Sequence, residues 1–291
     1  MFRMLYVLAL ASAALYGAAD FLGGFASRRT STIAIVVISQ GAGLVALGLL
    51  FPFLPASSPV RGDLMWGAAA GLAGGIGVAL LYRALAIGSM AVVAPITAVC
   101  AVTVPVAVAI ALGERPGMGP TAGIALAIFA IVLVSQQKTP EPSSQVVQGF
   151  SPVVRSSGVG IALASGVAIG LFFLALARTR ADAGMWPLVA ARSVSFVLFA
   201  MLALVARRSV RMPSNVAAIA VAGGVLDMLA NLLYLLASRY GPLSIVVTLS
   251  SLYPASTVLL ARTVLGDRLS GLQAAGIACA LVAVLLIVGT R

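Results

Sequence analysis

Ten long apolar runs fill most of this 291-residue chain and constrain its fold more than any other feature. A helix needs about 20 mostly apolar residues to span a bilayer. Hydrophobic residues make up 62% of the chain and charged residues 9%, whereas soluble domains are nearer one half and one quarter. The sequence therefore predicts an all-α membrane protein without a soluble domain, whose ten transmembrane helices span residues 5–27, 32–54, 63–86, 91–112, 118–136, 157–177, 186–206, 216–238, 243–263 and 270–289.

Charge and composition exclude several classes of function. The net charge of +11 comes from arginines scattered at the ends of the apolar runs, which is typical of membrane proteins rather than of a nucleic-acid-binding surface. The chain contains no histidine and no P-loop motif, so His-based catalysis, His-ligated metals and an ATPase site of its own are excluded. We expect no enzyme activity, no cofactor, no metal and no nucleic-acid partner.

The two halves of the sequence match at a shift of 153 residues. "ALAS" at 9–12 returns at 162–165, Gly17 falls on Gly170, and "LGER" at 112–115 falls on "LGDR" at 265–268. These matches predict a repeat at residues 1–137, a polar Pro- and Ser-rich linker at 138–156, and a second repeat at 157–291. Because each repeat holds five spans, the second must enter the membrane from the opposite side, which gives two inverted repeats around a central cavity.

Two stretches make this duplication specific. "LGDRLSGLQAAGIACALVAVLLIVG" (265–289) and "YRALAIGSMAVVAPITAV" (82–99) resemble the EamA repeat of the drug/metabolite transporter superfamily. The resemblance covers essentially the whole chain, twice, and its length and layout are closest to bacterial amino-acid and metabolite exporters. It implies a secondary carrier of small solutes, in which the first four helices of each repeat enclose a cavity and the fifth and tenth pack outside it.

A polar stripe follows the predicted eighth helix. Gly224, Asp227, Asn231, Tyr234 and Ser238 are spaced 3, 4, 3 and 4 residues apart, which places them on one helical face. A mid-span Asp is disfavoured in lipid by about 2.5–3.5 kcal/mol, so this face should point into the bundle. It either lines a hydrated cavity or forms a hydrogen-bonded seam between helices.

Asp20 is the other acid well inside a span, with Tyr16 four residues before it. Its counterpart at the 153-residue shift is Phe173, so only one half of the molecule has this carboxyl group. Asp20 could bind a proton or an amine, or could pair with Arg192, which lies inside the seventh span. Arg192 could instead bind the carboxylate of a substrate, because a guanidinium matches that geometry.

The predicted ninth helix and its counterpart, the fourth, supply the remaining candidates. Ser250 and Tyr253 share one stripe with Pro254 beside them. Prolines interrupt helical hydrogen bonding and could act as gating hinges, although they are also ordinary in membrane helices. The candidate substrate-binding residues are Tyr16, Asp20, Tyr82, Thr97, Arg192, Asp227, Asn231, Tyr234, Ser250 and Tyr253, and the candidate hinges are Pro95, Pro105 and Pro254.

These observations predict a multi-pass transporter of the bacterial inner membrane that works by alternating access, with an exported amino acid as substrate. The alternative is a non-transporting membrane scaffold or sensor with the same fold. Neither reading requires a partner protein. Setting Arg192 aside, ten basic residues fall on the linker side of the membrane and seven on the side of the termini. This difference favours a cytoplasmic linker and termini outside.

Overall fold

The computed structural model describes residues 2–87, 90–134, 152–265 and 271–289, and within these ranges the regular structure is helical throughout. The first half of the chain contains α1 (Phe2–Ser27), α2 (Thr32–Leu50), the 3₁₀ turn η1 (Phe51–Phe53), α3 (Arg61–Ile87), α4 (Met90–Ala111) and α5 (Met118–Val134). The second half contains α6 (Pro152–Ala177), the 3₁₀ turn η2 (Ala181–Ala183), α7 (Trp186–Val205), α8 (Ser214–Ala237), α9 (Leu243–Ser250), α10 (Tyr253–Leu265) and α11 (Gly271–Gly289).

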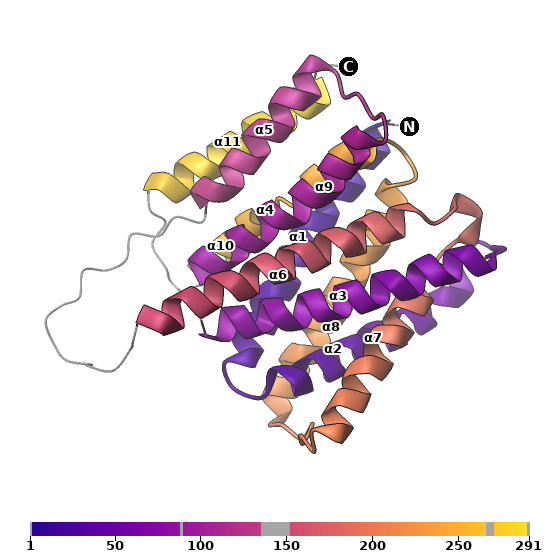
Figure 1. The fold of residues 1–291 in the computed structure, drawn as a ribbon, viewed down its shortest axis with the longest axis vertical. Helices are drawn as coiled ribbons and strands as arrows, with labels where there is room; N and C mark the ends of the chain where they lie inside the picture. The colour runs from indigo at the N-terminus through magenta and orange to yellow at the C-terminus, as the bar shows by residue number, and fades with distance from the viewer. Residues whose placement is uncertain (1, 88–89, 135–151, 266–270, 290–291) are drawn as a thin grey trace, which may run out of the picture.

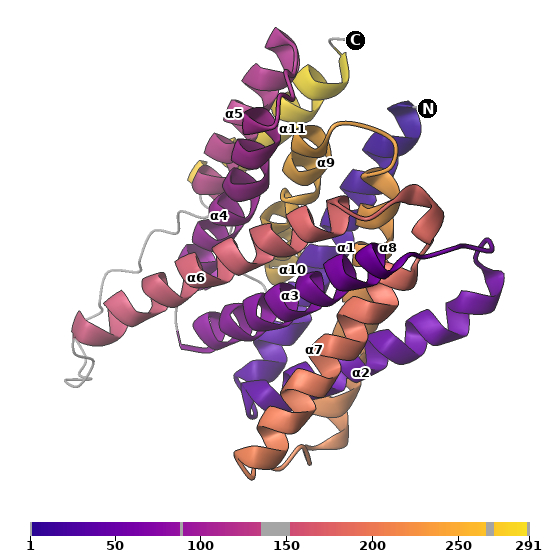
Figure 2. The same ribbon diagram turned by 45° about the vertical axis from the view of Figure 1, so that its right-hand side comes forward.

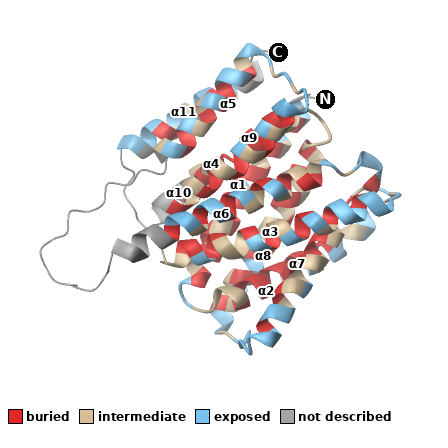
Figure 3. Cartoon of the chain, viewed as in Figure 1, coloured by how far each residue is buried: buried red, intermediate tan, exposed pale blue. Residues whose placement is uncertain are grey.

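The apolar helices account for the ten expected spans. Six of them, α1, α2, α3, α6, α7 and α8, are by themselves long and apolar enough to cross a membrane. Shorter apolar stretches lie in α4 and α5, across α9 and α10, and in α11. Their outer faces carry large hydrophobic side chains, such as Leu49 at 70% exposure and Leu285 at 69%, while buried residues gather between the helices (Figure 3). Exposed apolar side chains of this kind suit contact with lipid.

Two boundaries differ from the sequence prediction. The expected ninth span, 243–263, is interrupted at residues 251–252, so that α9 ends at Ser250 and α10 begins at Tyr253. Pro254 has no N–H to donate to the Ser250 carbonyl, which removes the hydrogen bond that would continue the helix. In addition, α6 begins at Pro152, inside the expected 138–156 linker, and most of that linker lies outside the described residues.

Equivalent helices of the two halves make equivalent contacts, which can be followed in Figures 1 and 2. Helix α1 packs along α8 just as its counterpart α6 packs along α3, and α2 lies on α8 as α7 lies on α3. Helices α5 and α11 pack mainly on each other at the edge of the bundle, and both termini lie at one end of the molecule. Five crossings per half invert the second half, so the fold is the predicted pair of inverted five-helix repeats.

Two glycines at equivalent positions confirm this relation at the level of single residues. A Cβ on Gly71 would lie 2.3 Å from the Ala191 carbonyl oxygen, and one on Gly224, which is 153 residues later, would lie 2.2 Å from that of Ser39. Neither position has room for a side chain, because α3 crosses α7 as closely as α8 crosses α2. These paired crossings bring the middles of four helices together around the centre of the molecule.

Candidate functional site: a central cavity with two unlike walls

A cavity lies between the two repeats, with about 620 Å³ of space between atoms when the part open to solvent is counted. Helices α1, α2, α3, α6, α7, α8 and α10 all contribute to its lining. We expected the first four spans of each repeat to surround the cavity. Among the described residues, α4 contributes none to the lining, whereas its counterpart, the span formed by α9 and α10, contributes Tyr253. The polar lining residues are Tyr16, Asp20, Gln40, Arg192, Ser195, Asp227, Asn231 and Tyr253.

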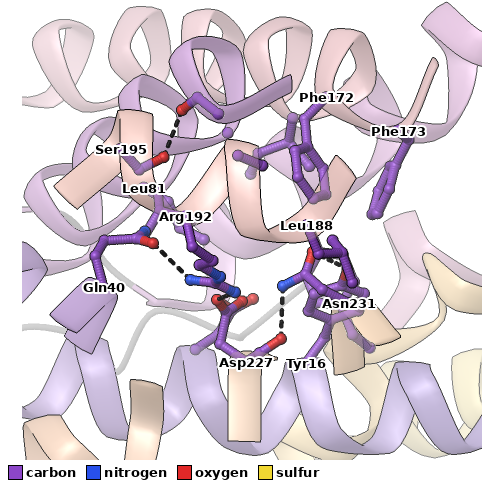
Figure 4. Close-up of a pocket in the computed structure, with 17 residues that line it drawn as sticks. Tyr16, Gln40, Leu81, Phe172, Phe173, Leu188, Arg192, Ser195, Asp227 and Asn231 are labelled. Atoms are coloured by element: carbon purple, nitrogen blue, oxygen red, sulfur yellow. Dashed lines mark hydrogen bonds and ion pairs between the residues drawn. The ribbon is translucent and has the colours of Figure 1, made fainter. Parts of the chain in front are cut away.

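Arg192 is the centre of the polar network (Figure 4). Its Nη2 atom makes an ion pair with Asp227, and its Nη1 atom donates to Gln40 Oε1 over 2.6 Å. The Arg192 side chain is 7% exposed and that of Asp227 is 13% exposed, so the pair is largely shielded from solvent. A charge in such a place is stable only while its partner neutralises it.

Asn231 extends the network to α1. Its side-chain amide donates to the backbone carbonyl of Asp227, and its Oδ1 atom accepts a 2.8 Å hydrogen bond from the Tyr16 hydroxyl. The Tyr16 ring meets that of Phe173 edge-on, with centroids 5.8 Å apart. Hydrogen bonds and ring contacts therefore connect α2, α7, α8, α1 and α6 around one space.

Asp20 lines the same cavity but has no hydrogen-bond or ion-pair partner among the described residues. The expected alternative, in which Asp20 pairs with Arg192, is wrong for this structure, because Arg192 pairs with Asp227. The sequence alone did not show this pairing, because it depends on α7 and α8 both packing on α2, which brings Arg192 to Asp227. Of the two carboxyl groups that line the cavity, Asp227 is paired and Asp20 is the one without such a partner in the described part of the chain.

Tyr253, the first residue of α10, also lines the cavity. Its ring lies edge-on to Tyr16, with centroids 6.4 Å apart, and its hydroxyl group is buried without a partner among the described residues. A buried hydroxyl that makes no hydrogen bond is costly, so the hydrogen-bonding capacity of this phenol is not satisfied by the described residues. The break between α9 and α10 is what ends one helix and starts the next at this residue.

Four candidate residues do not line the cavity. Three of them donate to backbone carbonyls of neighbouring helices. The Thr97 hydroxyl donates to Ala162, and the Tyr234 hydroxyl donates to Phe173. The Ser250 hydroxyl donates to Ala9. Tyr82 packs on Gly23, where a Cβ would lie 2.0 Å from its ring. These contacts join helices together, and the structure does not bring the four side chains to the lining.

The polar stripe on α8 therefore divides into residues that line the cavity and residues that contact neighbouring helices. Asp227 and Asn231 line the cavity, whereas Gly224 and Tyr234 belong to seams with α2 and α6. Ser238 lies just past the end of the helix, where its hydroxyl donates to the Leu235 carbonyl. Both readings of the stripe, lining and seam, apply to different parts of it.

The three candidate hinge prolines differ in whether their helices are interrupted. Helix α4 runs without interruption through positions 95 and 105, and the side chain of Pro95 lies outside the described residues. Pro105 packs near Gly170 of α6, where a Cβ would lie 3.3 Å from the proline ring. Of the three prolines, Pro254 alone lies next to a break in its span.

Gln40 and Ser195 were not predicted. Gln40 bonds Arg192, and the Ser195 hydroxyl donates to the Gly71 carbonyl over 2.5 Å. The signal for Gln40 was present in "VVISQGAG", where an amide interrupts an apolar span just as Asn231 does. Ser195 carried no such signal, because serines are common in membrane helices.

Cavity-lining residues at equivalent positions of the two repeats differ in polarity. At the 153-residue shift, Tyr16 corresponds to Ile169, Asp20 to Phe173, Asp227 to Gly74 and Asn231 to Val78, and all eight residues line the cavity. We call the four on α1 and α8 (Tyr16, Asp20, Asp227, Asn231) the polar wall, and the four on α6 and α3 (Ile169, Phe173, Gly74, Val78) the apolar wall. Figure 4 shows Phe172 and Phe173 on one side of the space and Tyr16, Asp227 and Asn231 on the other.

Comparison with known proteins agrees with this architecture. One solved structure, titled "Crystal structure of protein", is similar with a TM-score of 0.73 and 18% identity, over 98% of this chain and 96% of that one. A comparison with curated protein sequences gives no match. The EamA-like transporter family matches residues 3–136 and 156–289, two segments offset by the same 153 residues. The chain belongs to the EamA-like transporter family.

Proposed function

We propose that the protein is a secondary transporter that carries a small amphipathic metabolite, for which an amino acid is the best candidate, through the central cavity by alternating access. Membership of a transporter family supports movement of a small molecule across the membrane. The unlike walls of the cavity are the observation that carries the choice of substrate. A solute with a charged end and an apolar side group would match both walls at once.

The charged groups of the cavity include both signs, so each end of a zwitterion would meet an opposite charge. Asp227 already neutralises Arg192, while Asp20 has no partner among the described residues. An α-ammonium group would complement Asp20, and an α-carboxylate could take one face of the Arg192 guanidinium, which can bind two acceptors in a fork. The apolar wall, with Phe172 beside it, would then hold the side chain of the amino acid.

The proposed mechanism uses the two repeats, residues 1–137 and 157–291, as units that rock about the cavity. Asp227 acts as the resident counter-ion of Arg192 when no substrate is present, so the guanidinium is never left buried without a negative charge. The interruption between α9 and α10 lets the ninth span bend next to Tyr253. We place the protein in the bacterial inner membrane and propose export as the direction.

Counterflow in liposomes tests this function. Liposomes that contain the purified protein and are loaded with an unlabelled neutral amino acid should accumulate the labelled form from outside. The initial rate of uptake should saturate as the external concentration of the labelled amino acid rises. Leucine or phenylalanine should compete better than glycine, because only their side chains reach the apolar wall. An absence of saturable uptake for amino acids, sugars and other small solutes would favour the scaffold or sensor reading.

A further inference from the structure

A charged cluster joins the two repeats at the end of the molecule that carries the termini. Asp63, in the first turn of α3, accepts hydrogen bonds from the backbone amides of Val60 (3.0 Å) and Arg180 (2.9 Å). The same carboxylate makes an ion pair with Arg180 Nε at 3.3 Å. Asp63 belongs to the first repeat and Arg180, in the connection between α6 and α7, belongs to the second.

Other bonds strengthen the same junction. The Ser58 amide donates to the Asp182 carbonyl over 2.9 Å, so the connection before α3 is held to the connection before α7. Arg239, in the connection between α8 and α9, donates to the Gly184 carbonyl. Burial lowers the pKa of the Arg239 guanidinium, and the charges of Asp63 and Asp182 oppose that shift. Three connections thus meet on one side of the membrane.

The opposite side lacks the counterpart of this ion pair. At the 153-residue shift, Asp63 corresponds to Val216 and Arg180 to Ser27, so the equivalent junction joins the start of α8 to the end of α1. Val216 is 3% exposed within an apolar cluster, and the buried Ser27 hydroxyl has no partner among the described residues. A valine and a serine cannot form an ion pair, so the inverted repeat carries this device on one side only.

We propose that Asp63 and Arg180 form a latch that holds the cavity closed on the side of the termini, and that its one-sided placement sets the resting state of the protein. The latch rests on the two-state mechanism proposed above. Opening on the termini side separates the connections before α3 and before α7 and therefore breaks the pair. An interaction present in one state only shifts the balance between states by its full strength.

The size of the effect follows from the exposure of the pair. The Arg180 side chain is 49% exposed and that of Asp63 is 3% exposed, so water screens the guanidinium while the carboxylate is fixed by backbone amides. Partly exposed pairs of this kind contribute modestly, and we expect loss of the ion pair to change the ratio of the two states by about two- to fivefold.

Cysteine labelling in detergent tests the latch without any substrate. In a Cys100→Ala, Cys279→Ala background, Leu188→Cys reports on the termini side, because Leu188 lines the cavity in the first turn of α7. Leu81→Cys lines the cavity toward the other end of α3 and reports on the opposite side. We expect Arg180→Gln to raise the maleimide labelling rate at Leu188→Cys about two- to fivefold, without a rise at Leu81→Cys.

Two further variants control for charge and folding. Arg178→Gln removes a charge from an exposed side chain of the same connection, and Arg180→Lys keeps the charge near Asp63; both should label like the parent protein. Unchanged labelling in Arg180→Gln, or an equal rise at both reporter positions, would overturn the latch. Neither outcome concerns the transport proposal, which depends on counterflow by the protein with Asp63 and Arg180 intact.

Discussion

The polar wall and the apolar wall occupy equivalent places in the two repeats, yet their side chains have opposite chemistry. The polar wall on α1 and α8 holds two carboxylates, an amide and a phenol, whereas the apolar wall on α6 and α3 offers hydrocarbon and a glycine. The packing positions did not diverge in this way, since Gly71 and Gly224 make equivalent close crossings. The comparison shows that the duplicated scaffold keeps its helix crossings while the surface facing the cavity differs between the halves.

The largest expected effect comes from breaking the ion pair between Asp227 of the polar wall and Arg192. Asp227→Ala leaves the Arg192 guanidinium largely buried without its counter-ion, which should cost about 3–5 kcal/mol of stability and abolish transport. Thermal unfolding in detergent and counterflow measure the two effects separately. The Gly74 position, which is the equivalent of Asp227 on the apolar wall, has no such charge to lose.

The double variant Asp227→Asn, Arg192→Gln distinguishes architecture from function. With both charges removed, most of the lost stability should return, while transport should remain absent. If the double variant transports normally, Asp227 and Arg192 hold the helices together and have no role toward the solute.

The shared crossings give the next largest effect, and it should be the same in both halves. Gly71→Ala and Gly224→Ala each place a methyl group less than 2.5 Å from a backbone carbonyl of the neighbouring helix, and each should destabilise by about 1–3 kcal/mol. Gly48→Ala, where a Cβ meets nothing within 4 Å, is the matched control and should not lower the unfolding temperature. A clear difference between the Gly71 and Gly224 variants would weaken the claim that the repeats are equivalent in packing.

Asn231→Val converts one position of the polar wall to the residue type of its counterpart, Val78. The Tyr16 hydroxyl then loses its acceptor, which should cost about 1–2 kcal/mol and reduce transport roughly tenfold. The reverse substitution, Val78→Asn, should weaken counterflow of phenylalanine more than that of alanine, because it makes the apolar wall polar. Equal effects on both amino acids would contradict the assigned roles of the walls.

The sequence predicted the architecture well because it depends on features that repeat. Apolar runs, an odd number of spans and the 153-residue shift are enough to predict an inverted duplication. The pairing of Arg192 with Asp227 was not predictable in the same way, because it depends on how α7 and α8 each pack on α2, and two acids were available. Thr97, Tyr234 and Ser250 show a related limit, since a hydroxyl in a membrane helix can satisfy a neighbouring carbonyl as readily as it can face a cavity.

The interruption of the ninth span shows why prolines alone do not predict hinges. Helix α4 contains two prolines and continues, whereas its counterpart contains Pro254 and is divided into α9 and α10. A proline removes a single N–H, and the surrounding packing decides whether the remaining bonds hold the helix together. The break matters here because it leaves Tyr253 on the cavity with a hydroxyl that none of the described residues pairs.

The smallest effect on stability, and the sharpest test of the polar wall, comes from Asp20→Asn. Because Asp20 has no partner among the described residues, replacing its carboxyl group with an amide of similar shape breaks no hydrogen bond or ion pair there and should not lower the unfolding free energy. Affinity for a neutral amino acid should nevertheless fall about tenfold, since the ammonium group loses a charged acceptor. The matching substitution on the apolar wall, Phe173→Leu, should leave binding of glycine unchanged and weaken that of phenylalanine. If Asp20→Asn binds and carries amino acids as the unaltered protein does, the ammonium group lies elsewhere and the polar wall does not orient the solute.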